Sequence, residues 1–201
     1  MARRSEHSQE EIKKMILEAA EDIVQEYGFS ALKVRKIAAD IGYTVGSIYM
    51  VFTGMDDLIM HIKARTWRKL RICLEQERTE QITVQGVEDM ALVYFDFTVC
   101  NKGLWSMLFE HQLPIGKVAP EFYMAEYQQL VVSVALLLKE LDIQCSDAQL
   151  HQAAQILLSS MQGVCMQLAI QEGTRENIEL AKAQIVFLVN CLMRGWINGV
   201  N

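Results

Sequence analysis

The segment Val34–Phe52, which reads VRKIAADIGYTVGSIYMVF, restricts the possible folds of this chain more than any other segment. The apolar residues of its first half recur at helical spacing and share one face of a short helix: Val34, Ile37, Ala38 and Ile41. Gly42 can adopt the left-handed conformation that ends a helix. Thr44 can N-cap a second helix, whose buried face is expected to comprise Ile48, Val51 and Phe52. Two short helices joined by a tight glycine turn form a helix-turn-helix, whose second helix is shaped to enter the major groove of DNA.

The composition favours an all-helical fold. Of the 201 residues, 51% are hydrophobic, which is enough for a substantial core, and only two are proline. Alternating β-branched runs, which are typical of strands, are few. We expect about nine helices: residues 9–27 with Ser8 as N-cap, the two helices of the helix-turn-helix, and helices at about 55–78, 83–101, 104–112, 121–141, 146–173 and 175–196.

The sequence offers no sign of a membrane segment. Even its longest apolar runs, such as Ile185–Val189, are too short to span a bilayer. The N-terminus MARRSEHSQEE lacks the apolar segment of a signal peptide, so we expect a cytoplasmic protein. The cysteines form no CxxC pair and are interpreted as reduced, mostly buried thiols, with redox sensing as the alternative: Cys73, Cys100, Cys145, Cys165 and Cys191.

The net charge of −6 is unevenly distributed along the chain. Residues 1–78 hold 13 Lys and Arg against 12 Asp and Glu, whereas residues 79–201 hold 6 against 13. Because the local field decides whether phosphate is attracted, the acidic total does not exclude DNA binding by the N-terminal part. Its weak basicity predicts a modest non-specific affinity for DNA with a clear salt dependence.

About a quarter of the chain, ILEAAEDIVQEYGFSALKVRKIAADIGYTVGSIYMVFTGMDDLI, resembles the N-terminal DNA-binding domain of TetR-family transcriptional regulators. Many spaced positions agree, so the resemblance is more specific than a bare helix-turn-helix pattern. The matching landmarks are Ile16, Ala19, Ala20, Tyr27, Gly28, Phe29, Val34, Ile37, Ala38, Gly42, Gly46, Ile48, Tyr49, Phe52 and Leu58.

The resemblance implies a two-domain regulator. Residues 1–54 would form the helix-turn-helix domain and residues 55–201 a larger helical domain for effector binding and dimerisation. The implied function is a dimeric regulator, by the family's usual mode a repressor, that binds a palindromic double-stranded DNA operator and is released by a small apolar effector. Effector binding would shift the fourth helix and change the separation of the two recognition helices, which must lie roughly 34 Å apart.

Eight residues are candidate DNA contacts. Tyr49 matches the tyrosine that in this family hydrogen-bonds a backbone phosphate, with a half-buried core aromatic as the alternative. Arg35 can reach a guanine edge or a phosphate. The others are two lysines that can meet phosphate, two hydroxyl residues, and two apolar residues expected to be exposed and to contact thymine methyl groups: Lys33, Lys36, Thr44, Ser47, Val45 and Met50. Arg3 and Arg4 are phosphate candidates on an N-terminal arm.

The chain departs from the family pattern at three of its potential contacts. Many members carry Lys, His and Lys where this chain has Val45, Met50 and Met55. All three changes remove potential phosphate or base contacts, so the operator is not inferable from commoner members. Arg35 and the N-terminal arm would then carry more of the affinity, or DNA binding has been lost.

Aromatic and methionine side chains are concentrated in the middle of the chain. The simpler interpretation is that these side chains form a large helical core. The resemblance to the TetR family implies instead a mostly apolar effector cavity here. The candidate ligand contacts are Tyr94, Phe97, Trp105, Met107, Phe109, Phe122, Tyr123, Tyr127 and Met161. A cationic apolar ligand is favoured if one of the nearby acids Asp96, Glu110 or Glu126 is buried. His111 is either a polar handle or a charge at a helix C-terminus.

The last two helices are apolar around most of their circumference, as Ile156, Leu157, Met161, Phe187 and Leu188 illustrate. Such helices are buried on two sides, and a symmetric dimer through about residues 147–197 is the expected solution. The alternative is a monomer with a buried C-terminal hairpin.

The sequence also bears on two other classes of function, an enzyme and a protein-interaction module. An enzyme is not expected, because the chain lacks GxGxxG, Walker A, HExxH and GxSxG motifs and any metal-spaced Cys/His set. No metal or cofactor is expected either. The other class is a protein-interaction module, whose apolar contacts would be insensitive to salt, unlike phosphate contacts.

Overall fold

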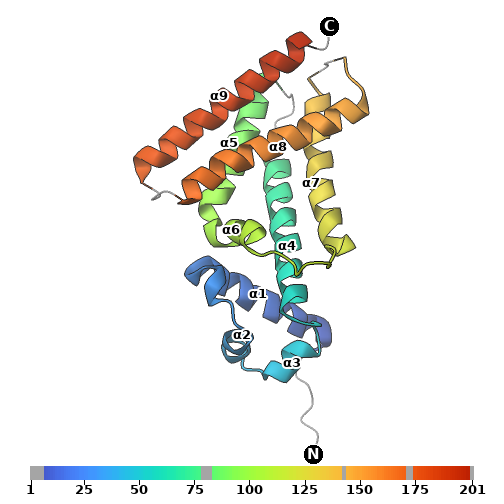
Figure 1. Cartoon of the computed structure of the whole chain (residues 1–201), viewed down its shortest axis with the longest axis vertical. Coiled ribbons are helices and arrows are strands. Elements are labelled where there is room, and N and C mark those ends of the chain that lie inside the picture. Colours follow the sequence, from blue (N-terminus) through green and yellow to red (C-terminus); the bar gives the residue numbers. More distant parts are fainter. Residues whose placement is uncertain (1–6, 78–82, 142–143, 171–173, 200–201) are drawn as a thin grey trace, which may run out of the picture. The chain divides into compact units, whose positions relative to one another are not determined.

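The computed structural model describes residues 7–77, 83–141, 144–170 and 174–199, with the side chains of 169, 170 and 197–199 left out. Over these residues the chain is helical, as predicted, with nine α-helices and one 3₁₀ turn (Figure 1). The helices are α1 Gln9–Tyr27, α2 Val34–Asp40, α3 Val45–Tyr49, α4 Met55–Gln76, α5 Val84–Cys100, α6 Lys102–Glu110, α7 Glu121–Lys139, α8 Asp147–Ile170 and α9 Arg175–Gly199, and the 3₁₀ turn is Phe29–Ala31.

Helix α1 begins and ends where the sequence predicts. The Ser8 hydroxyl accepts from the Glu11 backbone N–H, and the Glu11 carboxylate accepts from the Ser8 N–H, which forms a capping box. These bonds lower the pKa of Glu11, the backbone bond from Ser8 most of all. Gly28, with φ 80°, closes the other end.

Several helix boundaries differ from the prediction. Helix α7 ends at Lys139, two residues before the expected end, and α9 ends at Gly199, three residues after it. Helix α3 ends at Tyr49, so Val51 and Phe52 lie in the turn after it. Phe52 is still buried in the core, and its N–H donates to the Ile48 carbonyl, whereas Val51 is only partly buried. Helix α6 begins at Lys102 and ends at Glu110, two residues earlier than expected at each end. The expected ends of the fourth and eighth helices, at 78 and 173, lie outside the described residues.

The chain divides into two compact units. The first comprises the residues up to Thr66 together with 101–124, and the second comprises 67–100 together with 125–201. The sequence suggested a division at residue 54 between a DNA-binding and an effector domain. The first compact unit extends beyond that position and includes α6.

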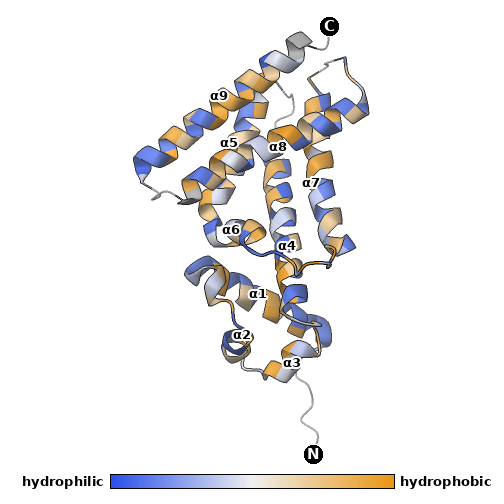
Figure 2. Ribbon diagram, viewed as in Figure 1, coloured by the Kyte–Doolittle hydropathy of each residue, from blue (hydrophilic) through white to orange (hydrophobic). Residues whose placement is uncertain are grey.

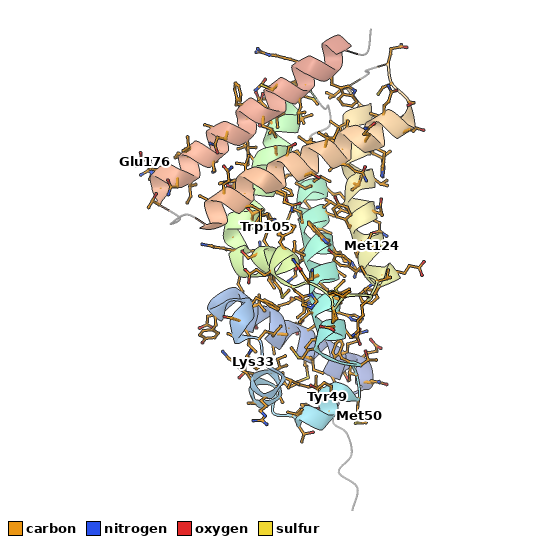
Figure 3. The ribbon with its side chains drawn as sticks, viewed as in Figure 1. Lys33, Tyr49, Met50, Trp105, Met124 and Glu176 are labelled. Atoms are coloured by element: carbon orange, nitrogen blue, oxygen red, sulfur yellow. The ribbon has the colours of Figure 1, made fainter. Side chains whose placement is uncertain are left out.

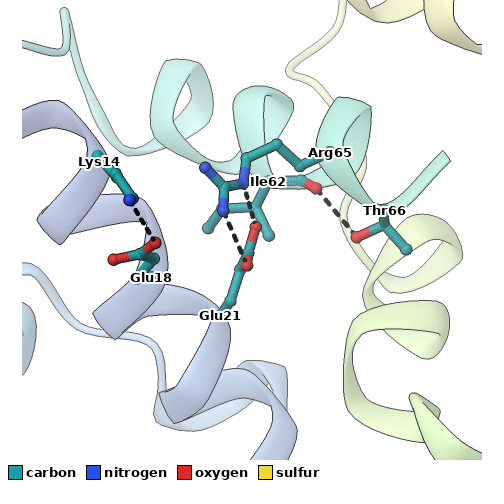
Figure 4. Close-up of polar contacts among 6 residues, drawn as sticks. All are labelled: Lys14, Glu18, Glu21, Ile62, Arg65 and Thr66. Carbon is teal, nitrogen blue, oxygen red and sulfur yellow. Dashed lines mark hydrogen bonds and ion pairs between the residues drawn. The ribbon is translucent and has the colours of Figure 1, made fainter. Parts of the chain in front are cut away.

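One continuous apolar core holds the first unit together. It contains fully buried residues from α1, α2, α3, the start of α4 and α6, among them Ile16, Ile37, Ile48, Leu58 and Met107. Helix α6 lies so close to α1 that a Cβ on Gly103 would be 2.2 Å from the Val24 carbonyl oxygen. Helices α1 and α4 are also joined by the ion pair between Glu21 and Arg65 (Figure 4).

The second unit is built around α5, which packs against both α8 and α9. Its buried residues include Tyr94 and Phe95 of α5, Leu157 of α8 and Ile185 of α9. Hydrophobic residues recur along much of α9 (Figure 2), and some of them, such as Phe187, are exposed.

The structure bears on two expectations drawn from composition, one about membrane-spanning helices and one about the cysteines. None of the described helices is both long and apolar enough to cross a membrane. All five cysteines are free thiols, but the expectation that most of them are buried is wrong: only Cys165 is buried, and Cys100 and Cys191 are exposed. Burial raises the pKa of the Cys165 thiol to about 11, so that thiol is protonated and poorly reactive at neutral pH.

Candidate nucleic-acid interface

Helices α2 and α3 are joined by the predicted glycine turn. Gly42 has φ 71°, and the Tyr43 N–H donates to the Ala38 carbonyl, 2.9 Å away, which closes α2. Helix α3 is then N-capped by Thr44, whose hydroxyl accepts from the Ser47 N–H at 3.1 Å. In contrast, Lys33 at the start of α2 makes no side-chain cap. The short second helix is therefore fixed at its N-terminus by one threonine.

The side chains at the end of α3 are presented to solvent. Tyr49 is 49% exposed and Met50, which follows the helix, is 80% exposed. Figure 3 shows them close together, with Lys33 at the start of α2. Arg35 is exposed on α2, and neither its side chain nor that of Lys33 has a hydrogen-bond or ion-pair partner among the described residues. This surface therefore offers DNA a hydroxyl, two cations and an apolar side chain that are not already engaged by other described residues.

Four other candidates are less available than the sequence suggested. Val45 was expected to be exposed, but it is partly buried and packs against the core of the first unit. The Lys36 ammonium lies 3.5 Å from the centroid of the Tyr27 ring, a cation–π contact. The hydroxyls of Thr44 and Ser47 bond each other at 2.9 Å. A base or phosphate would have to replace these contacts or share them.

Two polar contacts near α3 were not foreseen. The Tyr43 hydroxyl lies 2.9 Å from His7 Nδ1, and the Gln9 side-chain amide donates to the Met50 carbonyl at 3.5 Å. Both contacts join residues at the start of α1 to residues on either side of α3. Tyr43 stands directly before the cap residue, which is the signal that could have drawn attention to it. Arg3 and Arg4 lie outside the described residues.

The candidate effector contacts are divided between the two units. Trp105, Met107, Phe109, Phe122 and Tyr123 belong to the first. There Met107 is part of the common core, Trp105 packs on Phe109 with ring centroids 5.0 Å apart, and Phe122 stacks on His61 at 4.3 Å. Met107 therefore serves packing.

The remaining four candidates lie in the second unit. Tyr94, Phe97 and Met161 are buried, and Tyr127 packs on Trp67 with ring centroids 5.3 Å apart. None of the nine candidates lines the groove along α8 and α9 or the pocket formed by residues from 53–60 and 113–120.

The three acids near these aromatics differ in burial. Glu110 is exposed, and Asp96 pairs with Lys182 at 3.1 Å. Glu126 is buried and accepts hydrogen bonds from Arg68, whose pKa the pair raises. Glu126 thus meets the condition of burial, but Arg68 already compensates its charge, so this carboxylate does not require a cationic ligand.

A groove of about 440 Å³ lies along α8 and α9 in the second unit. It is mainly apolar and is lined by residues of both helices, including Ile156, Leu157, Met193 and Trp196. Ile156, Leu180 and Phe187 leave much of their apolar surface exposed on the same two helices.

Comparisons with known proteins agree with this geometry. Residues 16–62 match the sequence model of the family described as bacterial regulatory proteins, tetR family. A comparison with curated protein sequences gave no match.

Solved structures share the fold of the whole chain. A tetR-family transcriptional regulator from Streptomyces coelicolor has a TM-score of 0.72 at 17% identity, over 96% of this chain and 88% of that one. A TetR-family transcriptional regulator from Pectobacterium atrosepticum has a TM-score of 0.67 at 18% identity, over 97% of both chains. The multidrug binding protein EbrR, solved with imidazole, has a TM-score of 0.60 at 16% identity, over 94% and 97%.

The matched residues 16–62 contain the glycine turn, the capped helix α3 and the start of α4. Residues 16–62 therefore match the DNA-binding domain of the tetR family of bacterial regulatory proteins, and the chain shares its fold with solved structures of TetR-family regulators.

Proposed function

We propose that the protein is a homodimeric, effector-responsive repressor whose α3 enters the major groove of a palindromic operator. The observation that carries the proposal is the surface around α3, where Arg35, Tyr49 and Met50 are exposed beside a capped helix N-terminus. A helix held in this way can be inserted into the groove without unfolding its connection to α2.

Each exposed side chain suits a different part of DNA. The Tyr49 hydroxyl can donate to a backbone phosphate, and Lys33 can neutralise another phosphate. Arg35 can donate two hydrogen bonds to a guanine edge, while Met50 can contact a thymine methyl group. With few cations available, affinity rests on a small number of contacts, so each should be measurable by substitution.

Dimerisation and effector release complete the proposal. The exposed apolar residues of α8 and α9 support a twofold partner there, because a second copy would cover them. An effector would release the operator only through a higher affinity for the conformation that cannot bind DNA. Phe109 of α6, together with Phe122 and Tyr123 at the start of α7, are the effector candidates of the first unit that are not fully buried.

Fluorescence anisotropy on DNA from upstream of the protein's own gene, at two salt concentrations, tests the DNA-binding function. Scrambled DNA of the same length is the comparison. We expect a saturable preference for the native DNA that weakens as salt rises. Tyr49→Phe should weaken binding by roughly threefold to tenfold, the value of one hydrogen bond, and Arg35→Ala by more.

Lys14→Ala is the matched control, because Lys14 is an exposed cation of α1 that pairs with Glu18. It should leave the preference unchanged. Binding that neither salt nor the Arg35 change weakens would point to a protein partner instead. If the native DNA is not preferred, selection from random sequences would show whether any operator exists.

A further inference from the structure

Lys63, on α4, is a buried lysine with one hydrogen-bond acceptor. Its residue is 5% exposed, and its ammonium donates to the carbonyl oxygen of His111, 3.1 Å away. The ammonium also lies 5.5 Å from the centroid of the Tyr123 ring, near the outer limit of a cation–π contact. An ammonium has three N–H donors, so two of them have no recorded acceptor among the described residues.

Four neighbouring basic side chains of the first unit each lie close to a carboxylate. Arg65 donates to Glu21 at 2.5 Å, and His61 Nδ1 lies 3.2 Å from the Asp57 carboxylate. Asp56 accepts from both His111 Nε2, at 3.3 Å, and Lys117, at 3.2 Å. Their hydrogen bonds lower the pKa of Asp56, that from His111 most of all. Among the described residues, Lys63 has no such carboxylate.

A structural role accounts for only part of this arrangement. His111 is the C-cap of α6, so the Lys63 ammonium bonds a carbonyl at the negative end of that helix. This contact satisfies one donor but supplies no counter-charge, and burial alone lowers the pKa of Lys63. A buried cation without a counter-ion is costly, whereas one that binds an anion is well compensated.

His111, whose carbonyl accepts from Lys63, also carries a buried polar side-chain atom. The side chain of His111 is 7% exposed, and its Nδ1 has no hydrogen-bond partner among the described residues. Because the Nε2–H donates to Asp56, Nδ1 accepts a hydrogen bond in the neutral ring and donates one in the protonated ring. In the protonated form it adds a donor for an anion.

We propose that the effector of this regulator is an organic carboxylate whose charged end binds the Lys63 ammonium, with His111 Nδ1 as the second polar contact and the Tyr123 ring against its apolar part. The inference rests on the proposed effector-responsive function and names the chemical class of the effector. Tyr123 is one of the candidate ligand contacts from the sequence, whereas Lys63 is not. The carboxylate would replace the counter-charge that the protein itself does not provide.

Matched pairs of small molecules separate charge from shape. The probes are benzoate against benzamide and octanoate against octanamide, each at millimolar concentration, with binding followed by calorimetry. We expect the full-length protein to bind at least one carboxylate more tightly than its amide. Lys63→Met, which keeps the length of the side chain, should weaken binding of that carboxylate roughly tenfold or more. Lys14→Met removes the same charge from an exposed position on α1 and should change little.

A direct readout on the unmodified protein covers the case in which Lys63→Met does not fold. With ¹³C-labelled lysine, the ε-methylene signal of Lys63, assigned through Lys63→Arg, should move on titration with the carboxylate and not with the amide. A carboxylate that binds without moving this signal would overturn the proposal, and so would the lack of any preference for carboxylate over amide. Operator affinity measured without probe reports separately on the regulator function.

Discussion

At the scale of single residues, Gly103 shows how tightly the first unit is packed. A Cβ there would lie 2.2 Å from the Val24 carbonyl oxygen and 3.0 Å from the Gln25 Cα, both backbone atoms of α1. Within a helix, Gly→Ala normally stabilises by up to about 1 kcal/mol. Here we expect Gly103→Ala to lower the free energy of unfolding by about 1–3 kcal/mol, because α1 and α6 must separate. Urea unfolding measures the change.

Gly163→Ala is the matched control for that substitution. Gly163 lies in α8, and a Cβ there would meet no atom within 4 Å. This change should leave stability unaltered or raise it. If Gly103→Ala proved as stable as the wild type, α6 would not be seated on α1 as described, and the close contact would carry no constraint.

The residues that could be predicted from the sequence are those whose role is local. Gly42 and Thr44 do what their conformational preference and their hydroxyl dictate, whatever the rest of the fold. Val45 and Lys63 could not be placed, because their burial depends on segments distant in sequence. Lys63 in particular stands in a strongly charged stretch of α4, where solvent exposure is the ordinary expectation.

At the scale of elements, the recognition helix depends on its N-cap. Helix α3 has only five residues, too few to be stable by itself, and the Thr44 hydroxyl satisfies one of its free N–H groups. Thr44→Ala should cost about 1 kcal/mol of local stability. We expect faster hydrogen exchange at the Ser47 amide and roughly fivefold weaker operator binding.

Thr44→Ser keeps the accepting oxygen and serves as the control for the cap. It should restore both the exchange rate and the affinity. Should Thr44→Ala weaken DNA binding while the Ser47 exchange rate stays unchanged, the hydroxyl would act on DNA directly, and its capping bond would be dispensable.

The ion pair between Glu21 and Arg65 fastens α1 to α4 (Figure 4). Arg65 Nε lies 2.5 Å from one carboxylate oxygen and Nη2 lies 3.3 Å from the other. Glu21 is buried, so removing Arg65 leaves a charge that water cannot reach. In a double-mutant cycle with Glu21→Gln and Arg65→Met, we expect a coupling energy of about 1–3 kcal/mol in urea unfolding. Additive effects of the two changes would contradict this linkage.

Helix positions were predictable to the extent that capping and breaker residues mark them. Ser8, Gly28 and Thr44 gave the ends of α1 and the start of α3. Helix α6 lacks such a mark: Asn101 precedes it without a side-chain cap. Its start at Lys102 instead follows from packing on α1, where Gly103 permits the close approach. Tertiary contact, which a single sequence does not display, set that boundary.

At the scale of the whole molecule, the uneven charge and the apolar surface of the last two helices both fit the proposed DNA-binding dimer. The acidic excess lies beyond residue 78, away in sequence from the candidate DNA contacts. Exposed apolar residues on α8 and α9 would be covered by a second copy of the chain. The proposed dimer would present two copies of α3 to the two halves of a palindrome, which would double a contact set that is small in each protomer.

Ile156 provides the test of this assembly. It lines the groove along α8 and α9 and is 47% exposed, so a charge there should cost little in the monomer but would be desolvated between two copies. Ile156→Asp should yield a monomer in sedimentation velocity at micromolar concentration and weaken operator binding by roughly tenfold or more. Val132→Asp on α7, which is equally exposed at 47%, should remain dimeric and bind DNA as the wild type does. A dimer that persists with Ile156→Asp and dissociates with Val132→Asp would place the interface on α7 instead.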